Sequence, residues 1–278
     1  MSAKIALPPK IVGIICNWCC YGGADLCGVS RFQYPPHIRL IRVMCSARAD
    51  IKHIFHAFSN GADGMLVGGC HLDDCHYITH GNYEAMSMVQ LAKKLLAHAG
   101  VDPRRLRIEW VSAGEGIRFA NLMNEFSREI EGLGPLGQAE GEKPDELEAG
   151  LAAVTRLIPY IKLVKKEKLS LHLRENPAAY DDLYTMDEIE ELLGSVPSFY
   201  IDPDRCQACM ICSRRCPVNA IDGRKNRIHV IDQKRCIHCG TCLDVCPPKF
   251  GAICTIVDEP VPPPPLEEKR MIARKAAS

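Results

Sequence analysis

The chain has 278 residues, 47% of them hydrophobic and 24% charged, and its formal net charge is zero. This length and composition are typical of a folded protein with room for two domains. The zero net charge gives no support to a nucleic acid as partner, and no apolar stretch is long enough to span a membrane. Because residues 1–10 lack the apolar core of a signal peptide, we expect a cytoplasmic protein whose sixteen cysteines are reduced and mostly bind metal.

From residue 10 to about residue 132, short apolar runs alternate with helical stretches. Helices are expected after N-caps at Asp50, at Asn82 and at Ser112, the last in a capping box with Glu115. Strands that alternate with helices predict a parallel sheet covered on both faces, here a flavodoxin-like α/β domain over residues 1–134. Ligands of such sheets bind beyond the carboxyl ends of the strands. The expected strands are Ile11–Cys16, Ile38–Cys45, Gly64–Cys70 and Leu106–Val111.

Seven cysteines lie within the first 75 residues, and five of them lie at or just beyond the ends of expected strands. A parallel sheet brings these ends side by side, so we expect the five thiols to converge. Cys20 and Cys27 do not follow this pattern and are expected to be small buried core residues. The five cysteines, called here the N-terminal thiol group, are Cys16, Cys19, Cys45, Cys70 and Cys75.

The ligand that this group would bind is not fixed by the spacing of its cysteines. Four thiolates can hold zinc, a 2Fe–2S cluster or a 4Fe–4S cluster. His71 and His76 directly follow two of the cysteines, so a mixed cysteine–histidine site also stays open. The motifs further along the chain favour iron.

Residues 135–198 predict a linker followed by helices. The segment 132–150 is rich in glycine and charge, as linkers are. Apolar residues then recur at steps of three and four, which predicts a helix that Pro159 should kink or interrupt. Such a stripe usually packs in a core, and a docking face for another subunit is the alternative. The stripe consists of Leu147, Leu151, Val154, Ile158 and Ile161.

Residues 199–257 contain the pattern Cys-x2-Cys-x2-Cys-x3-Cys-Pro twice, with a 30-residue offset. In bacterial ferredoxins each such motif gives three thiolates to one 4Fe–4S cluster and its fourth cysteine to the other. We therefore expect a small α+β domain that its two clusters hold together, followed by a Pro-rich extended tail over residues 258–278. The expected ligands are Cys206, Cys209, Cys212 and Cys246 at the first cluster site, and Cys216, Cys236, Cys239 and Cys242 at the second.

Distinctive short motifs surround the N-terminal thiol group, among them Cys16-Asn17-Trp18-Cys19, Arg42-Val43-Met44-Cys45-Ser46, Gly69-Cys70-His71, Asp74-Cys75-His76-Tyr77 and Glu109-Trp110-Val111-Ser112-Ala113. In these motifs, residues 10–134 resemble the delta subunit of methyl-viologen-reducing hydrogenase. The resemblance implies a 2Fe–2S cluster with four ligands among the five thiols. It also implies electron transfer from a hydrogenase or formate dehydrogenase to the flavin subunit of a heterodisulfide reductase complex, and participation in flavin-based bifurcation.

We therefore expect an oxygen-sensitive, anaerobic electron-transfer subunit with two 4Fe–4S clusters and one 2Fe–2S cluster. The sequence contains no nucleophile–base arrangement, Walker loop or flavin motif, so no substrate-converting site is expected. Two alternatives stay open. One is a redox sensor, and the other is a zinc-stabilised adaptor with a fused ferredoxin. Zinc has no redox chemistry, so metal content separates the adaptor from the electron carrier.

Overall fold

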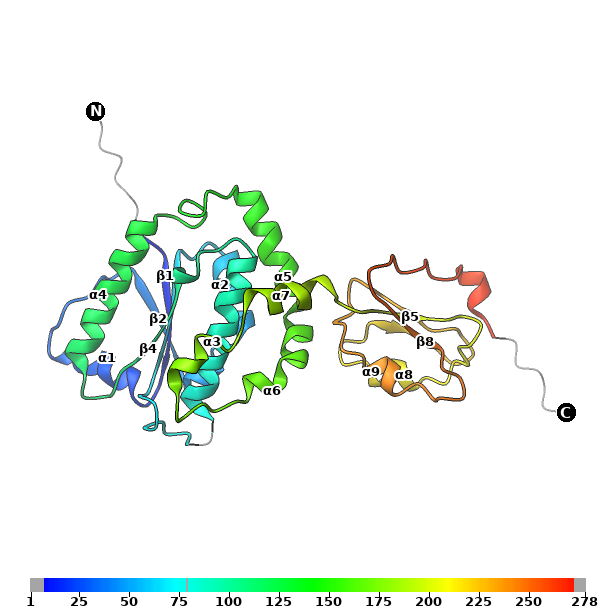
Figure 1. The fold of residues 1–278 in the computed structure, drawn as a ribbon, viewed down its shortest axis with the longest axis horizontal. Coiled ribbons are helices and arrows are strands. Elements are labelled where there is room, and N and C mark those ends of the chain that lie inside the picture. Colours follow the sequence, from blue (N-terminus) through cyan, green and yellow to red (C-terminus); the bar gives the residue numbers. More distant parts are fainter. Residues whose placement is uncertain (1–7, 79, 273–278) are drawn as a thin grey trace, which may run out of the picture. The chain divides into compact units, whose positions relative to one another are not determined.

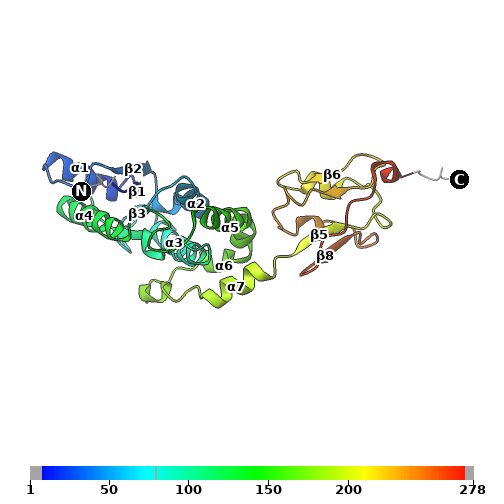
Figure 2. The ribbon, with the colours of Figure 1, turned by 90° about the horizontal axis from the view of Figure 1, so that it is seen from above.

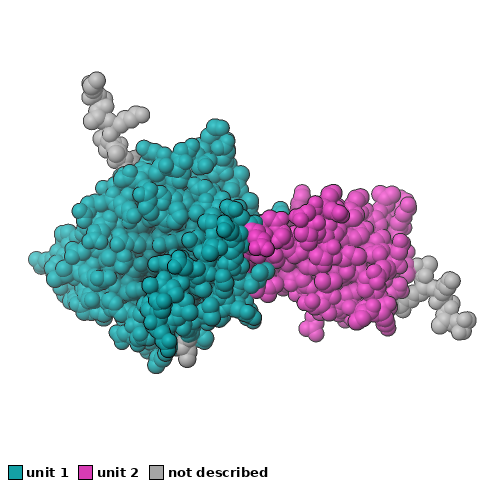
Figure 3. All heavy atoms as spheres, in the orientation of Figure 1, with its two compact units in different colours: residues 1–158, 164–190 teal, residues 159–163, 191–278 magenta. Residues whose placement is uncertain are grey.

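The computed structural model describes residues 8–78 and 80–272. The chain divides into two compact units (Figure 3). The first comprises residues up to 158 together with 164–190, and the second comprises residues 159–163 and 191 onward. Among the described residues, no helix combines the length and the apolar character that a membrane crossing requires.

The first unit is built on a four-stranded parallel sheet (Figure 1). Its order is β2-β1-β3-β4, which is the flavodoxin-like order, so the predicted α/β class is confirmed. The register pairs Cys16 with Val43 and Gly69 with Trp110, so the carboxyl ends of the strands lie at one edge. The strands are β1 (Ile11–Cys16), β2 (Ile38–Val43), β3 (Gly64–Gly69) and β4 (Leu106–Trp110).

Helices cover both faces of this sheet (Figure 1). Helices α1 (Cys20–Val29) and α4 (Gly116–Leu133) lie on one face, and α2 (Ile51–Ser59) and α3 (Gly81–His98) on the other. The core between α1, α4 and the sheet is fully buried and includes Ile15, Leu66 and Phe126. Short 3-10 turns lie at Ser46–Arg48 and Pro103–Arg105.

Of the three N-caps that the sequence predicts, the structure contains one. Asp50 caps α2 as predicted, because its carboxylate accepts the Lys52 N–H at 2.9 Å. Asn82 does not cap α3; it lies inside the helix, and its amide donates to the carbonyls of Cys70 (3.0 Å) and His71 (2.6 Å). At α4, Glu115 reaches back to the Ser112 N–H at 2.7 Å, but Glu115 itself is the N-cap, so only half of the expected box forms.

The segment after α4 contains α5 (Pro144–Val164), α6 (Lys166–Leu169), the 3-10 turn Pro177–Tyr180 and α7 (Met186–Gly194). The apolar stripe of α5 is buried throughout, as the core interpretation predicts. Pro159 lies within α5, and the helix continues past it to Val164, so the expected interruption does not occur. Ser87 of α3 donates to the Lys168 carbonyl at 3.1 Å, which joins α6 to α3 (Figure 2).

The second unit is small and its two halves interleave. Strand β5 (Ser198–Ile201) pairs antiparallel with β8 (Ile253–Ile256), and β6 (Ile221–Asp222) pairs with β7 (Val230–Ile231). The first strand of one half thus pairs with the last strand of the other. Helices α8 (Ile211–Arg215) and α9 (Thr241–Asp244) occupy equivalent places in the repeat. This is the α+β arrangement that the repeated motif predicts.

The Pro-rich segment Pro262–Pro265 is neither helix nor strand, and the chain after it packs back onto the second unit. The 3-10 turn Glu267–Arg270 follows Pro262–Pro265. Arg270 is buried and donates to Asp222 Oδ2 at 2.9 Å, while the Ile228 N–H donates to the Arg270 carbonyl at 2.7 Å. Residues 267–272 therefore belong to the folded part of this unit, which the sequence did not indicate.

Candidate iron–sulfur sites

The N-terminal thiol group lies at the carboxyl edge of the parallel sheet. Cys16 ends β1 and Cys70 follows the neighbouring strand β3, and their Sγ atoms are 3.7 Å apart. The thiol of Cys19 contacts that of Cys70, and the thiols of Cys45 and Cys75 contact each other. The structure therefore brings all five cysteines into one group, Cys19 included.

At the centre of this group, the Cys70 thiol and backbone N–H groups favour the thiolate form of Cys16. The hydrogen bond from the Cys70 thiol lowers the pKa of Cys16, against the opposing effect of burial. The Cys20 N–H, in the first turn of α1, lies 3.3 Å from Cys16 Sγ and acts in the same direction. The pKa of Cys70 is raised by the same contact and by burial. Thiolates are the ligand form of cysteine, so the donor set and its setting fit a thiolate-ligated metal or cluster.

Three polar and aromatic contacts around the thiols were not indicated by the sequence. Asn82 holds the carbonyls of Cys70 and His71 and thereby fixes the loop after β3. His71 Nε2 lies 2.6 Å from Glu115, and His76 stacks on Trp18 at a centroid distance of 4.0 Å. Both histidines thus have partners other than the thiols, and neither contact is local in sequence.

Cys20 and Cys27 are buried in α1 and belong to the core, as expected. Burial raises the pKa of both thiols. Cys20 packs so closely against β3 that a Cβ added at Gly68 would lie 2.5 Å from its Sγ. The Cys27 thiol donates to the Phe32 carbonyl at 3.5 Å.

In the second unit, left-handed residues turn the chain within each cysteine motif. Ala208 and His238 occupy equivalent positions of the repeat and have φ angles of 50° and 56°. Met210 and Gly240, also equivalent, have φ angles of 68° and 74° and precede α8 and α9. These turns fold each Cys-x2-Cys-x2-Cys run around a small space, which is what three thiolates need to meet one cluster.

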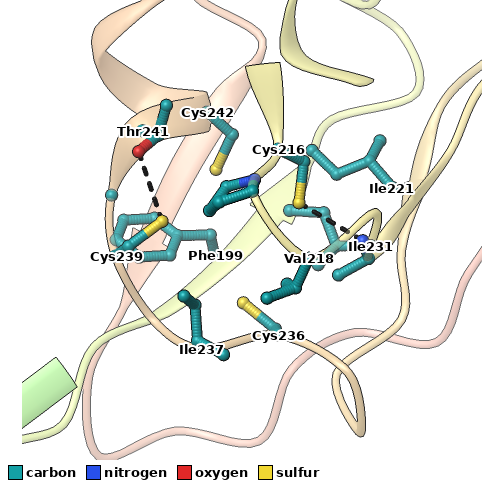
Figure 4. Close-up of a pocket in the computed structure, with 13 residues that line it drawn as sticks. Phe199, Cys216, Val218, Ile221, Ile231, Cys236, Ile237, Cys239, Thr241 and Cys242 are labelled. Carbon is teal, nitrogen blue, oxygen red and sulfur yellow. Dashed lines mark hydrogen bonds between the residues drawn. The ribbon is translucent and has the colours of Figure 1, made fainter. Parts of the chain in front are cut away.

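The second cluster site forms one pocket in the structure (Figure 4). Its four cysteines come from both halves of the repeat, and apolar side chains such as Phe199 and Ile237 complete the wall. Burial, followed by the charge of Cys236, raises the pKa of Cys242 to about 12. The Ala220 N–H lies 3.2 Å from Cys216 Sγ. Four sulfur donors in an apolar pocket fit a 4Fe–4S cluster.

The first cluster site is brought together in the same way. Burial is the main cause that raises the pKa of Cys212 to about 12. The nearby thiols of Cys206, Cys209 and Cys246 raise it further through repulsion between like charges. Cys246 belongs to the second motif, so this group also crosses between the halves. The exchange of the fourth cysteine between motifs remains a prediction about ligands. Cys254, in β8, lies outside both groups.

A parallel α/β unit with converging thiols, on one chain with a two-motif ferredoxin-like unit, defines an iron–sulfur protein. Residues 11–134 match the family of the methyl-viologen-reducing hydrogenase delta subunit, and residues 198–247 match the 4Fe–4S dicluster domain. The chain is 50% identical over 127 residues to an iron–sulfur subunit of the F420-non-reducing hydrogenase of Archaeoglobus profundus, and the match covers 46% of this chain and 92% of that protein. The chain therefore belongs to the methyl-viologen-reducing hydrogenase delta subunit family, and it carries a 4Fe–4S dicluster domain.

A second kind of relative is much longer than this chain. The chain is 51% identical over 129 residues to a subunit of the ferredoxin/F(420)H(2)-dependent CoB-CoM heterodisulfide reductase of Methanosarcina acetivorans. The match covers 46% of this chain and 16% of that protein, and the counterpart in Methanosarcina mazei is matched over the same shares. All five cysteines of the N-terminal thiol group lie within the family match of residues 11–134.

Proposed function

We propose that this chain is an electron-transfer subunit that relays electrons between a donor enzyme of the hydrogenase or formate dehydrogenase type and a flavin subunit of a heterodisulfide-reductase-like complex. The observation that carries the proposal is the presence of three separate thiol groups on one chain. Two of them fit 4Fe–4S clusters, whose chemistry is one-electron transfer. The chain supplies the ligands and the surroundings that tune each potential.

We assign a 2Fe–2S cluster to the N-terminal thiol group. Four cysteinyl sulfurs suit such a cluster, and the resemblance to the family implies it. Cys16 and Cys70 are buried whereas Cys19, Cys45 and Cys75 are only half-buried, so a cluster held here would lie near the surface. A position near the surface allows electron exchange with a partner.

A partner surface beside this site is supported by exposed apolar side chains. Trp18 is 40% exposed and stacks on His76, which in turn meets the ring of Tyr77, itself 39% exposed. Met44, next to Cys45 in the sequence, is 56% exposed. Large apolar groups gathered at a surface mark interaction sites. We propose that a redox partner covers this surface.

The names of the relatives support the identity of the partners. The domain that residues 11–134 form is found both in an iron–sulfur subunit of a hydrogenase and in a subunit of a heterodisulfide reductase. In the reductase this domain is part of a longer chain. This fusion supports the proposal that the present chain binds a reductase subunit and exchanges electrons with it. Since a flavin can divide an electron pair between two acceptors, we extend the proposal to flavin-based bifurcation.

The experiment is an anaerobic redox titration of the full-length protein, followed by electron paramagnetic resonance. We expect three reducible clusters. Cys70→Ser should remove or alter the signal of the 2Fe–2S cluster and leave the two 4Fe–4S signals, because Cys70 lies at the centre of the N-terminal group. Cys27→Ser is the matched control and should keep all three signals, since a serine hydroxyl can still donate to the Phe32 carbonyl.

Two other outcomes would replace the proposal. Two reducible clusters together with bound zinc would favour the adaptor. An N-terminal group that holds no metal and forms a reversible disulfide on oxidation would favour the redox sensor. In either case the electron path would end at the dicluster domain.

A further inference from the structure

The two cluster sites of the second unit are related by the 30-residue repeat, but their side-chain surroundings differ. Phe199 in the first half and His229 in the second occupy equivalent positions, and both are buried. Phe199 lines the pocket of the second cluster site. His229 instead places its Nδ1 atom 3.2 Å from the Sγ atom of Cys212, at the first cluster site. The same position therefore carries an apolar ring at one site and a polar ring at the other.

An opposite difference exists at the first residue of the short helix inside each motif. Thr241 Oγ1 lies 3.2 Å from Cys239 Sγ at the second cluster site (Figure 4). The equivalent residue at the first site is Ile211, which has no polar group to offer Cys209. Each site thus has one side-chain donor that the other site lacks.

The chemistry of a ligated thiolate fixes the direction of these contacts. Iron-bound cysteine carries no proton, so the contact with His229 is attractive only when Nδ1 carries the hydrogen. By the same argument the Thr241 hydroxyl is the donor toward Cys239. A hydrogen bond to a cluster sulfur favours the reduced cluster, which carries one more negative charge, and therefore raises the reduction potential.

The contact of His229 is the more buried of the two. Its side chain and Cys212 are both buried, whereas Thr241 and Cys239 are half-buried. The charged groups that act on the ring, Arg270 and Asp222, are paired with each other at 2.9 Å. A hydrogen bond in a low-dielectric setting is electrostatically stronger than one near water, so His229 should have the larger effect.

A second histidine shows that proximity alone does not produce this contact. His238 is also buried, and its backbone N–H lies 3.4 Å from Cys236 Sγ. Its ring, however, turns away and places Nδ1 2.8 Å from the Pro197 carbonyl. Within the described residues of this unit, His229 is the histidine whose ring meets a cysteine of a cluster site.

We propose that His229 raises the reduction potential of the first cluster and Thr241, to a smaller extent, that of the second, so that an electron in this unit rests on the first cluster. When one electron passes from the second cluster to the first, the second cluster is oxidised by one electron and the first is reduced by one electron. The inference rests on the proposed function, because it takes both 4Fe–4S clusters as present.

The test exchanges each residue for its counterpart in the repeat. His229→Phe copies Phe199, and Thr241→Ile copies Ile211. The full-length variants are titrated anaerobically, with electron paramagnetic resonance and iron content as readouts. We expect His229→Phe to shift the reduction equilibrium of the first cluster about tenfold toward the oxidised form, which for one electron is about 59 mV. Thr241→Ile should shift only the second cluster, and by less.

Two further variants separate tuning from a structural effect. In His229→Asn the amide keeps a donor close to the place of Nδ1, so the potential should stay near that of the wild type. If His229→Phe does not retain its clusters, His229→Leu provides the same loss of the donor in a smaller side chain. Cys209→Ser and Cys239→Ser, each of which changes one ligand, assign the two signals to their sites.

The outcomes distinguish this inference from the proposed function. Full iron content with an unchanged potential in His229→Phe would overturn the role of His229. A wild-type protein without two reducible 4Fe–4S clusters would instead overturn the proposed function. A shift of both clusters in either variant would indicate a general change of the unit and would also contradict the inference.

Discussion

The last cysteine of each ferredoxin-type motif has neighbours that come from the other motif. Cys216 lines one pocket with Cys236, Cys239 and Cys242 (Figure 4). Cys246 is close enough to Cys212 for its charge to raise the pKa of Cys212. The interleaved pairing of β5 with β8 and of β6 with β7 brings the two halves together and makes this exchange sterically simple. These neighbours are the ones that the predicted ligand exchange requires, and the exchange itself stays a prediction.

This exchange makes a prediction about Cys216. In Cys216→Ser we expect the second cluster to be altered and the first cluster to keep its spectrum, because Cys216 lies among the three cysteines of the other motif. The measurement is electron paramagnetic resonance of the reduced variant, with iron content per chain. Cys254→Ser, which changes a cysteine outside both groups, is the control and should leave both clusters intact. Loss of the first cluster alone would show that each motif supplies all four ligands to its own cluster.

At the scale of the elements, helix α1 begins directly after Cys19 of the N-terminal group, and it packs closely against α4 and the segment before it. A Cβ added at Gly23 would lie 2.8 Å from the Ser112 carbonyl oxygen and 2.9 Å from the Val111 side chain. In the same way, a Cβ added at Gly116, the first residue of α4, would lie 2.8 Å from the backbone nitrogen of Cys27. Glycine is required here by close approach and not by backbone conformation.

Two alanine substitutions in α1 test this close packing. Gly23→Ala should lower the free energy of unfolding of the first unit by about 1–3 kcal/mol, because backbone atoms cannot yield to the added methyl group. Gly28→Ala lies in the same helix with nothing within 4 Å of its added Cβ, and it should raise the free energy of unfolding by about 0.5–1 kcal/mol through helix propensity. Anaerobic denaturation with urea provides the measurement. Equal effects of the two substitutions would contradict the packing argument.

Strands of this protein can be predicted from its sequence more accurately than contacts between distant segments. The sequence predicts the four strands of the parallel sheet to within two residues. The central strands β1 and β3 are continuous apolar runs, as buried parallel strands are, whereas β2 and β4 at the two edges contain charged residues. Asn82 was misassigned as a cap, since its partners are the carbonyls of Cys70 and His71 in another segment. A cap motif is local, whereas these hydrogen bonds depend on the folded loop after β3.

Buried polar contacts between distant segments were missed for the same reason. Arg105 has a fully buried side chain whose Nε donates to Glu140 at 2.6 Å and whose Nη1 donates to the Gly134 carbonyl at 2.9 Å. Arg270 returns to Asp222 across 48 residues. At the sites, the cysteines could be found by spacing, but the contact of His229 with Cys212 could not, because its only sequence signal is the mismatch with Phe199 in the repeat.

At the scale of the whole molecule, the chain combines a domain of the hydrogenase delta family with a dicluster domain, and three thiol groups lie on one polypeptide. Three metal sites can form an electron relay only if each of them takes up and releases electrons. The identity of the metal in the N-terminal thiol group therefore decides between a relay and an adaptor, since zinc cannot take up an electron.

The most direct test is the content of iron, acid-labile sulfide and zinc in full-length protein purified without oxygen. We predict about ten irons and about ten sulfides per chain, with no stoichiometric zinc, because two 4Fe–4S clusters and one 2Fe–2S cluster require that number. About eight irons with one zinc would contradict the relay and would assign the N-terminal thiol group to a structural metal.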